Sequence, residues 1–140
     1  MTITDLITRL EAATKGSVKL DCEIALAVGW TIFRHTVQNN YDSVWDEWLP
    51  PGKLPGAGIP GQMPFYTTSL DAALTLVPDG WTVARISQTD RKGWNVELRE
   101  GYLSSYNRVV IAPYKYNAPT PALAMCAAAL KAREAECLSA

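Results

Sequence analysis

Residues 38–64 constrain this chain more than any other segment, because prolines and glycines recur through them too often for regular structure to continue. The breakers are Pro50, Pro51, Pro55, Pro60 and Pro64, with Gly52, Gly56, Gly58 and Gly61. The same segment holds Tyr41, Trp45 and Trp48. Long irregular segments in a compact domain are usually functional or disordered, and aromatic side chains make good interface anchors. We therefore expect a loop insertion here that forms an ordered lid or an interface arm.

Helical patterns flank this insertion on both sides. Apolar residues recur there at helical spacing, and Thr4, Ser17, Thr68 and Thr120 stand where N-caps are expected. The expected helices cover 4–14, 18–28, 68–77 and about 121–137.

Strand patterns follow the third helix. The segments 81–87 and 94–99 alternate in polarity, 108–112 is a short apolar run, and 30–37 is an ambiguous fourth member. Short connections favour antiparallel pairing. A length of 140 residues fits one domain. The sequence therefore predicts a single α+β domain over 1–140, with an antiparallel sheet of three to four strands sandwiched by helices.

Composition excludes several classes of protein. A net charge of −1, from 13 basic and 14 acidic residues, argues against general nucleic-acid binding. No CxxC motif is formed by Cys22, Cys126 and Cys137, which favours a role as small apolar core residues. Reduced thiols of this kind suit a cytoplasmic protein. No apolar run reaches the roughly 18 residues of a membrane span, and no secretory leader is evident. We expect a cytoplasmic protein that does not bind membranes.

The search for catalytic chemistry finds little. His35 is the sole histidine, and no HExxH, GxSxG, P-loop or GxGxxG motif is present. The carboxylates Asp42, Asp46 and Glu47 are too few to suggest a metal centre. We expect no enzyme activity, no cofactor and no metal.

Aromatic and guanidinium side chains form the more suggestive set. Aromatic faces stack on bases, and arginine forks match phosphates. Arg85 and Arg108 interrupt otherwise apolar strands, so each is either on an open face or placed for a ligand. The predicted ligand-binding residues are Arg85, Arg108, Trp45, Trp48, Trp94 and Tyr106.

Three segments are familiar as a set: "DLITRLEAATKGSVKLDCEIALAVGW" at 5–30, "YTTSLDAALTLVPDGW" at 66–81 and "TPALAMCAAALKAREAE" at 120–136. Together they resemble the small phage and prophage proteins that carry a phage ABA sandwich domain. The resemblance covers the two ends and the middle helix and leaves out 31–64. It implies a phage source and a sheet between helical layers, and it transfers no chemistry.

These observations leave three hypotheses for function. The first is a phage counter-defence protein that sequesters a host nucleotide-derived immune messenger, either cyclic or of ADP-ribose type. It would be a homo-oligomer whose interfaces use the Ala-rich last helix and the aromatic arm. The second is a module that binds a host or phage protein through Trp45 and Trp48. The third is a messenger-degrading hydrolase that depends on His35.

Overall fold

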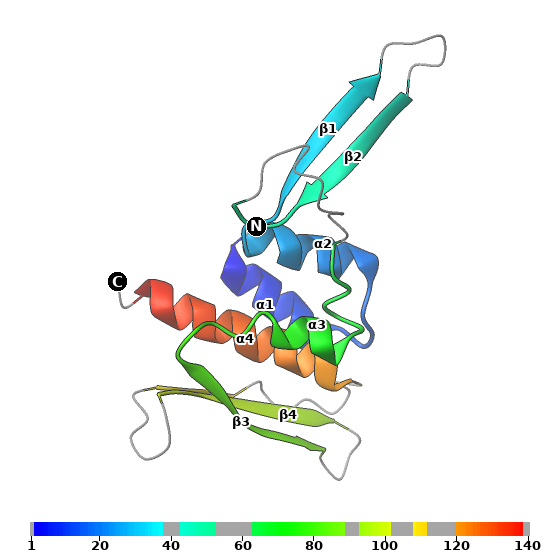
Figure 1. Cartoon of the computed structure of the whole chain (residues 1–140). Helices are drawn as coiled ribbons and strands as arrows, with labels where there is room; N and C mark the ends of the chain where they lie inside the picture. The colour runs from blue at the N-terminus through cyan, green and yellow to red at the C-terminus, as the bar shows by residue number, and fades with distance from the viewer. Residues whose placement is uncertain are drawn as a thin grey trace.

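A computed structural model describes residues 2–37, 43–52, 63–88, 93–101, 108–111 and 120–138. Their order of elements confirms an α+β fold (Figure 1). The elements are α1 (Ile3–Ala12), α2 (Val18–Ala27), β1 (Thr31–Val37), β2 (Ser43–Leu49), α3 (Leu70–Leu74), β3 (Trp81–Gln88), β4 (Trp94–Glu100), β5 (Val109–Ile111) and α4 (Pro121–Leu138).

Side-chain caps set the starts of the helices. Thr2, rather than Thr4, caps α1: its Oγ1 accepts a hydrogen bond from the Asp5 backbone N–H at 3.1 Å, and the Asp5 carboxylate accepts one from the Thr2 N–H at 3.2 Å. These bonds stabilise the charged carboxylate and lower the pKa of Asp5. Ser69 takes the cap of α3 in place of the expected Thr68, so this helix begins at Leu70, two residues after the expected start at 68.

Helix α4 lies at the centre of the body. Residues 122–130 are all buried, most of them alanine or another small side chain. Helices α1 and α3 pack on one side of α4 and strand β4 packs on the other (Figure 1). A helix that is apolar all round must be covered all round. The small-residue face that we expected at a subunit interface is therefore buried within the chain itself.

Strands β3, β4 and β5 form an antiparallel sheet beneath α4. Val96 and Leu98 point into the core and are fully buried. Among the described residues, helices cover only the face of the sheet that carries Val96 and Leu98. The expected sandwich therefore has helices on one side of the sheet and not on both. Arg85 pairs with Glu97 in register on the opposite face, and Thr82 pairs with Arg99. Such alternation of apolar and polar residues is typical of an antiparallel sheet with one solvated face.

Strands β1 and β2 form a separate antiparallel hairpin that stands away from the body (Figure 1). The register runs from Thr31 opposite Leu49 to Val37 opposite Ser43. The prediction of β1 as a fourth strand of the main sheet was wrong, and so was that of irregular chain throughout 38–64. The reason is local, since the prolines and glycines of that segment start at Pro50, after β2 has ended.

The base of the hairpin is fixed to the body. Gly29 enters the hairpin with a φ of 103°, which favours glycine. The Trp30 indole N–H donates to the Tyr66 hydroxyl at 3.0 Å. Leu49 is buried at the end of β2, and Trp48 packs against the core. The orientation of the ribbon is thus set by packed aromatic and aliphatic side chains.

A buried polar contact joins α2 to the segment before α3. Asp21 is 1% exposed and Thr67 is fully buried. The Asp21 Oδ1 atom accepts hydrogen bonds from the Thr67 N–H and the Thr67 hydroxyl, both at 2.7 Å. The Ser17 N–H donates to the Thr67 hydroxyl at 3.0 Å. This Asp21–Thr67 contact fastens the chain that leads into α3 to the start of α2.

Candidate functional site: the β1–β2 hairpin

The two faces of the hairpin carry different side chains. On one face, the His35 Nε2 atom lies 2.7 Å from the Glu47 Oε2 atom, and the Phe33 ring packs edge-on against the His35 ring at 4.7 Å. On the other face, the Arg34 Nε–H donates to the Asp46 Oδ1 atom at 3.1 Å. The Asp46 carboxylate raises the pKa of the Arg34 guanidinium. Each face thus holds one pair of charged or ionisable groups.

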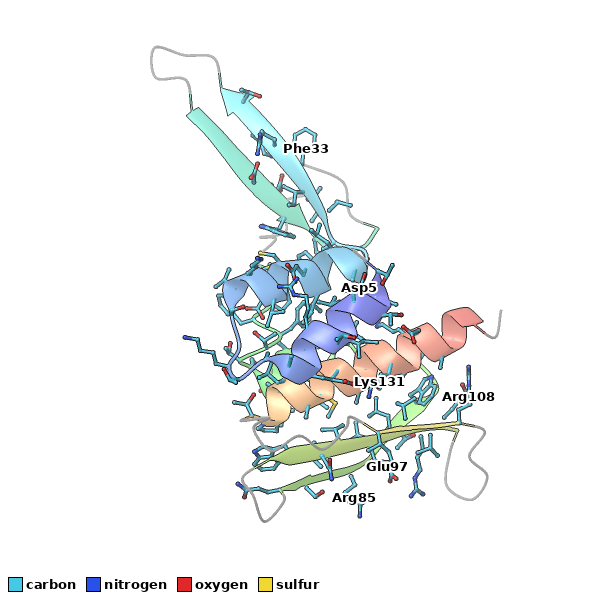
Figure 2. All side chains as sticks on the ribbon, turned by 180° about the vertical axis from the view of Figure 1, so that it is seen from behind. Asp5, Phe33, Arg85, Glu97, Arg108 and Lys131 are labelled. Atoms are coloured by element: carbon cyan, nitrogen blue, oxygen red, sulfur yellow. The ribbon has the colours of Figure 1, made fainter. Side chains whose placement is uncertain are left out.

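Two large apolar side chains on β1 are left open to solvent. Ile32 is 45% exposed and Phe33 is 42% exposed. They are neighbours in a strand, so they point to opposite faces of the ribbon. Figure 2 shows Phe33 on the projecting part of the molecule, well away from the helices. Each face of the projecting ribbon therefore carries one large apolar side chain that the body leaves uncovered.

Arg108, predicted to bind a ligand, is bonded within the chain. One guanidinium nitrogen donates to the Ala135 carbonyl at 2.6 Å, another pairs with the Glu100 carboxylate, and the group lies 5.5 Å from the Trp81 ring centre. The Trp81 indole N–H donates to the Glu136 Oε1 atom at 3.0 Å. Arg108 therefore holds the last turns of α4 to the sheet.

The other predicted ligand-binding residues do not converge on one pocket. Arg85 is exposed on the outer face of β3, separate from Arg108 in Figure 2. Trp94 packs against the core at the start of β4. Trp48 lies at the base of the hairpin, and Trp45 pairs with His35 in the register of β1 and β2. Tyr106 is outside the described residues.

Sequence reasoning missed Ile32 and Phe33, although a signal was present. Two consecutive large apolar residues in a strand cannot both face one core, since neighbouring side chains alternate between faces. In a two-stranded ribbon that leaves the body, one or both must be exposed. The pattern of 30–37 identified a strand without showing which segment it would pair with.

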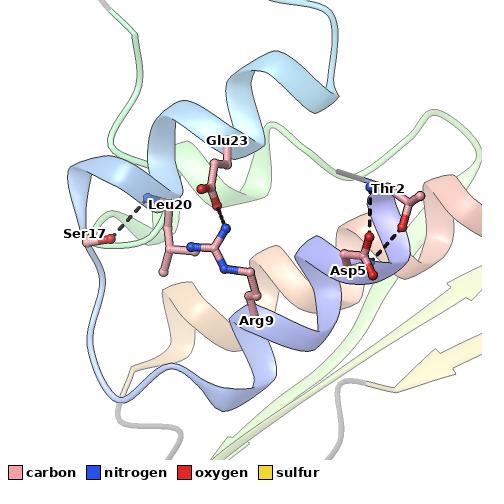
Figure 3. A network of polar contacts seen from close by, with 6 residues as sticks. All are labelled: Thr2, Asp5, Arg9, Ser17, Leu20 and Glu23. Atoms are coloured by element: carbon pink, nitrogen blue, oxygen red, sulfur yellow. Dashed lines mark hydrogen bonds and ion pairs between the residues drawn. The ribbon is translucent and has the colours of Figure 1, made fainter.

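A cavity of about 290 Å³ lies between α1 and α2. The lining comprises Thr2, Leu6, Glu23, Leu26 and Ala27. Figure 3 shows that the Glu23 carboxylate beside it is paired with Arg9, an ion pair that joins the two helices. Among the described lining residues the ionisable group is a carboxylate, which does not favour a phosphate ligand.

The described residues contain no group of three or more His, Cys, Asp and Glu side chains that could hold a metal ion. Burial raises the pKa of both the Cys22 and the Cys126 thiols. The Cys126 thiol donates to the Tyr66 carbonyl at 3.2 Å. Both groups thus favour the protonated thiol over the reactive thiolate.

Comparison of the chain with models of known families, with curated proteins and with solved structures finds no match. The resemblance to the phage ABA sandwich domain remains a prediction. No helix in the described ranges combines the length and apolar character needed to cross a membrane.

Proposed function

We propose that this protein binds another protein through its β1–β2 hairpin. The observation that carries the proposal is the pair Ile32 and Phe33, each exposed by more than two fifths on a ribbon that projects from the body. Aromatic and aliphatic anchors of this kind supply much of the binding energy at protein interfaces. Under this proposal the protein is a binding module rather than an enzyme.

The resemblance to phage ABA sandwich proteins supports a phage source and action in the cytoplasm of an infected bacterium. Sequestration of a nucleotide-derived messenger, the other sequence-based hypothesis, has less support from the described geometry. Arg108 is bonded to Ala135 and Glu100, and Arg85 lies on another face of the sheet. Messenger binding stays a prediction, and a thermal-shift screen run alongside the capture experiment tests it.

The test compares three immobilised baits in a lysate of the infected host. They are the wild-type chain, the hairpin variant Ile32→Ser with Phe33→Ser, and the matched control Val109→Ser with Ile111→Ser. The control residues are each 49% exposed, and they lie on β5 rather than on the hairpin. Circular dichroism first verifies that all three baits are folded.

We expect one partner that wild type and control capture equally and that the hairpin variant captures at least tenfold less. Identical capture by all three baits, or no specific capture, would refute the proposal. A thermal-shift screen with cyclic dinucleotides and ADP-ribose isomers runs alongside, since a tight ligand of the native state raises the melting temperature. A concentration-dependent shift without protein capture would favour the messenger hypothesis.

A further inference from the structure

The position of Ile32 and Phe33 restricts how a partner can cover them. They are adjacent on β1 and point to opposite faces of the hairpin, so one flat surface reaches only one of them. A strand placed alongside β1 has side chains on both faces. It would flank Ile32 on one face and Phe33 on the other. The exposed apolar pair therefore favours a partner strand over a partner surface.

The backbone of β1 has room for such a strand. In the described part of the chain, β1 pairs with β2 on one side and with no strand on the other. An unpaired edge presents a row of N–H and C=O groups that can template a further strand. A two-stranded hairpin is only marginally stable by itself, so a third strand would also stabilise it.

The side chains of β1 indicate the chemistry of that strand. Arg34 and His35 stand in the middle of β1, which carries no carboxylate, and the Arg34 side chain is 72% exposed. The strand that already pairs with β1 is acidic and aromatic: Asp46 lies opposite Arg34, and Trp48 lies opposite Ile32. A strand on the outer edge of β1, away from β2, would lie beside the same β1 side chains. Opposite charges and apolar pairs across strands are stabilising.

We propose that the outer edge of β1 accepts an extended acidic and apolar strand from the partner protein. This inference rests on the proposed protein-binding function and adds the mode and chemistry of binding. The occupant is a different protein rather than a second copy. A second copy that placed its β2 on this edge would leave its own β1 edge open, and such head-to-tail contacts repeat without closing. A second copy that paired its β1 antiparallel with this β1 in full overlap would place Arg34 opposite Arg34, and like charges directly opposite each other are destabilising.

The test uses a probe whose sequence is that of β2. The ¹⁵N-labelled full chain is titrated to millimolar concentrations of the capped peptide Ser-Val-Trp-Asp-Glu-Trp-Leu. A second peptide, with lysine at both acidic positions, serves as the charge control. In an edge strand, alternate amides point outwards, so edge pairing should slow hydrogen exchange at alternate β1 residues and leave β2 amides unchanged.

We expect saturable binding of the acidic peptide and at least fivefold weaker binding of the lysine peptide. Arg34→Glu should weaken binding of the acidic peptide about fivefold to tenfold, as charge reversal at one cross-strand pair predicts. Arg85→Glu is the matched control, since Arg85 is also exposed on a strand opposite a carboxylate, Glu97. Arg85→Glu should leave the affinity unchanged.

The inference would be overturned by a lack of protection of β1 amides at millimolar peptide or by equal binding of the two peptides. Loss of protection in β2 would indicate strand exchange and would likewise overturn it. Reversible polymerisation of the chain alone that Arg34→Glu abolishes would identify a second copy as the occupant and would also overturn the inference.

If the peptide fails to bind but capture still depends on Ile32 and Phe33, the proposed function stands and only the strand-addition mode is wrong. If the peptide binds at β1 but no bait captures a partner, the edge chemistry is supported and the proposed function fails.

Discussion

Replacement of Thr67 by valine should destabilise the protein more than its small change in shape suggests. Valine has nearly the same volume as threonine, so the fully buried site stays filled. The hydroxyl, however, donates to the Asp21 Oδ1 atom at 2.7 Å and accepts from the Ser17 N–H at 3.0 Å. Valine can do neither, so a carboxylate that is 1% exposed loses one of its two donors from Thr67.

The magnitude follows from these two bonds. A hydrogen bond to a charged group contributes about 2 kcal/mol, and an unsatisfied, partly buried N–H costs about 1 kcal/mol. We expect Thr67→Val to lower the free energy of unfolding by about 3 kcal/mol. For a domain of this size that corresponds to a drop of about 10 °C in melting temperature.

Urea denaturation and thermal melting of the full chain provide the assay, with Thr67→Ser as the control. Serine keeps the hydroxyl and loses one methyl group, so its cost should be about 1 kcal/mol. A valine variant as stable as the serine variant would show that the hydroxyl contributes little and that the reasoning is wrong.

Three further predictions concern other contacts of the body. Gly16→Ala should cost about 2 kcal/mol in a urea melt, because a Cβ atom there would lie 2.6 Å from the Thr67 carbonyl oxygen; an unchanged midpoint would contradict this close approach. Arg108→Gln should lower the free energy of unfolding by about 2 kcal/mol, whereas Arg85→Gln should change it by less than about 0.5 kcal/mol. If Arg85→Gln destabilised the protein more than Arg108→Gln did, the structural role of Arg108 would be refuted and its predicted role in ligand binding would stand again. Ellman's reagent at pH 8 should modify Cys126 only after unfolding in guanidinium, as peptide mass spectrometry can show, because burial raises the pKa of that thiol; rapid labelling of the native chain would refute this.

The fold of the body could be predicted from sequence because α1, α2 and the sheet strands bury one face each, while α4 is apolar on every side through 122–130. Apolar periodicity located the helices that became α1, α2 and α4, and the alternation in β3 and β4 located their sheet. Except in α4, these patterns arise because each element buries only one of its faces. The chain length and the short connections then sufficed for an α+β domain.

The hairpin could not be predicted in the same way. The residues of β1 read as a strand, but pairing with Ser43–Leu49 depends on a second segment that the neighbouring prolines obscured. Arg108 presents a similar limit. A charge in an apolar run indicates an open face or a ligand, whereas here it meets the carbonyl of Ala135, which only the packing of α4 brings near.

The central place of α4 has a consequence for how the protein is made. Helix α1 and strand β4 are covered by a helix that begins at Pro121, and the contacts between α1 and that helix join residues more than a hundred positions apart. During synthesis those surfaces must wait until residues 121–138 leave the ribosome, and contacts over such separations form slowly. The hairpin needs only residues 31–49. Pairing within the segment proposed to recognise a partner can therefore begin before the domain is complete, although a two-stranded ribbon is only marginally stable until the body holds its base.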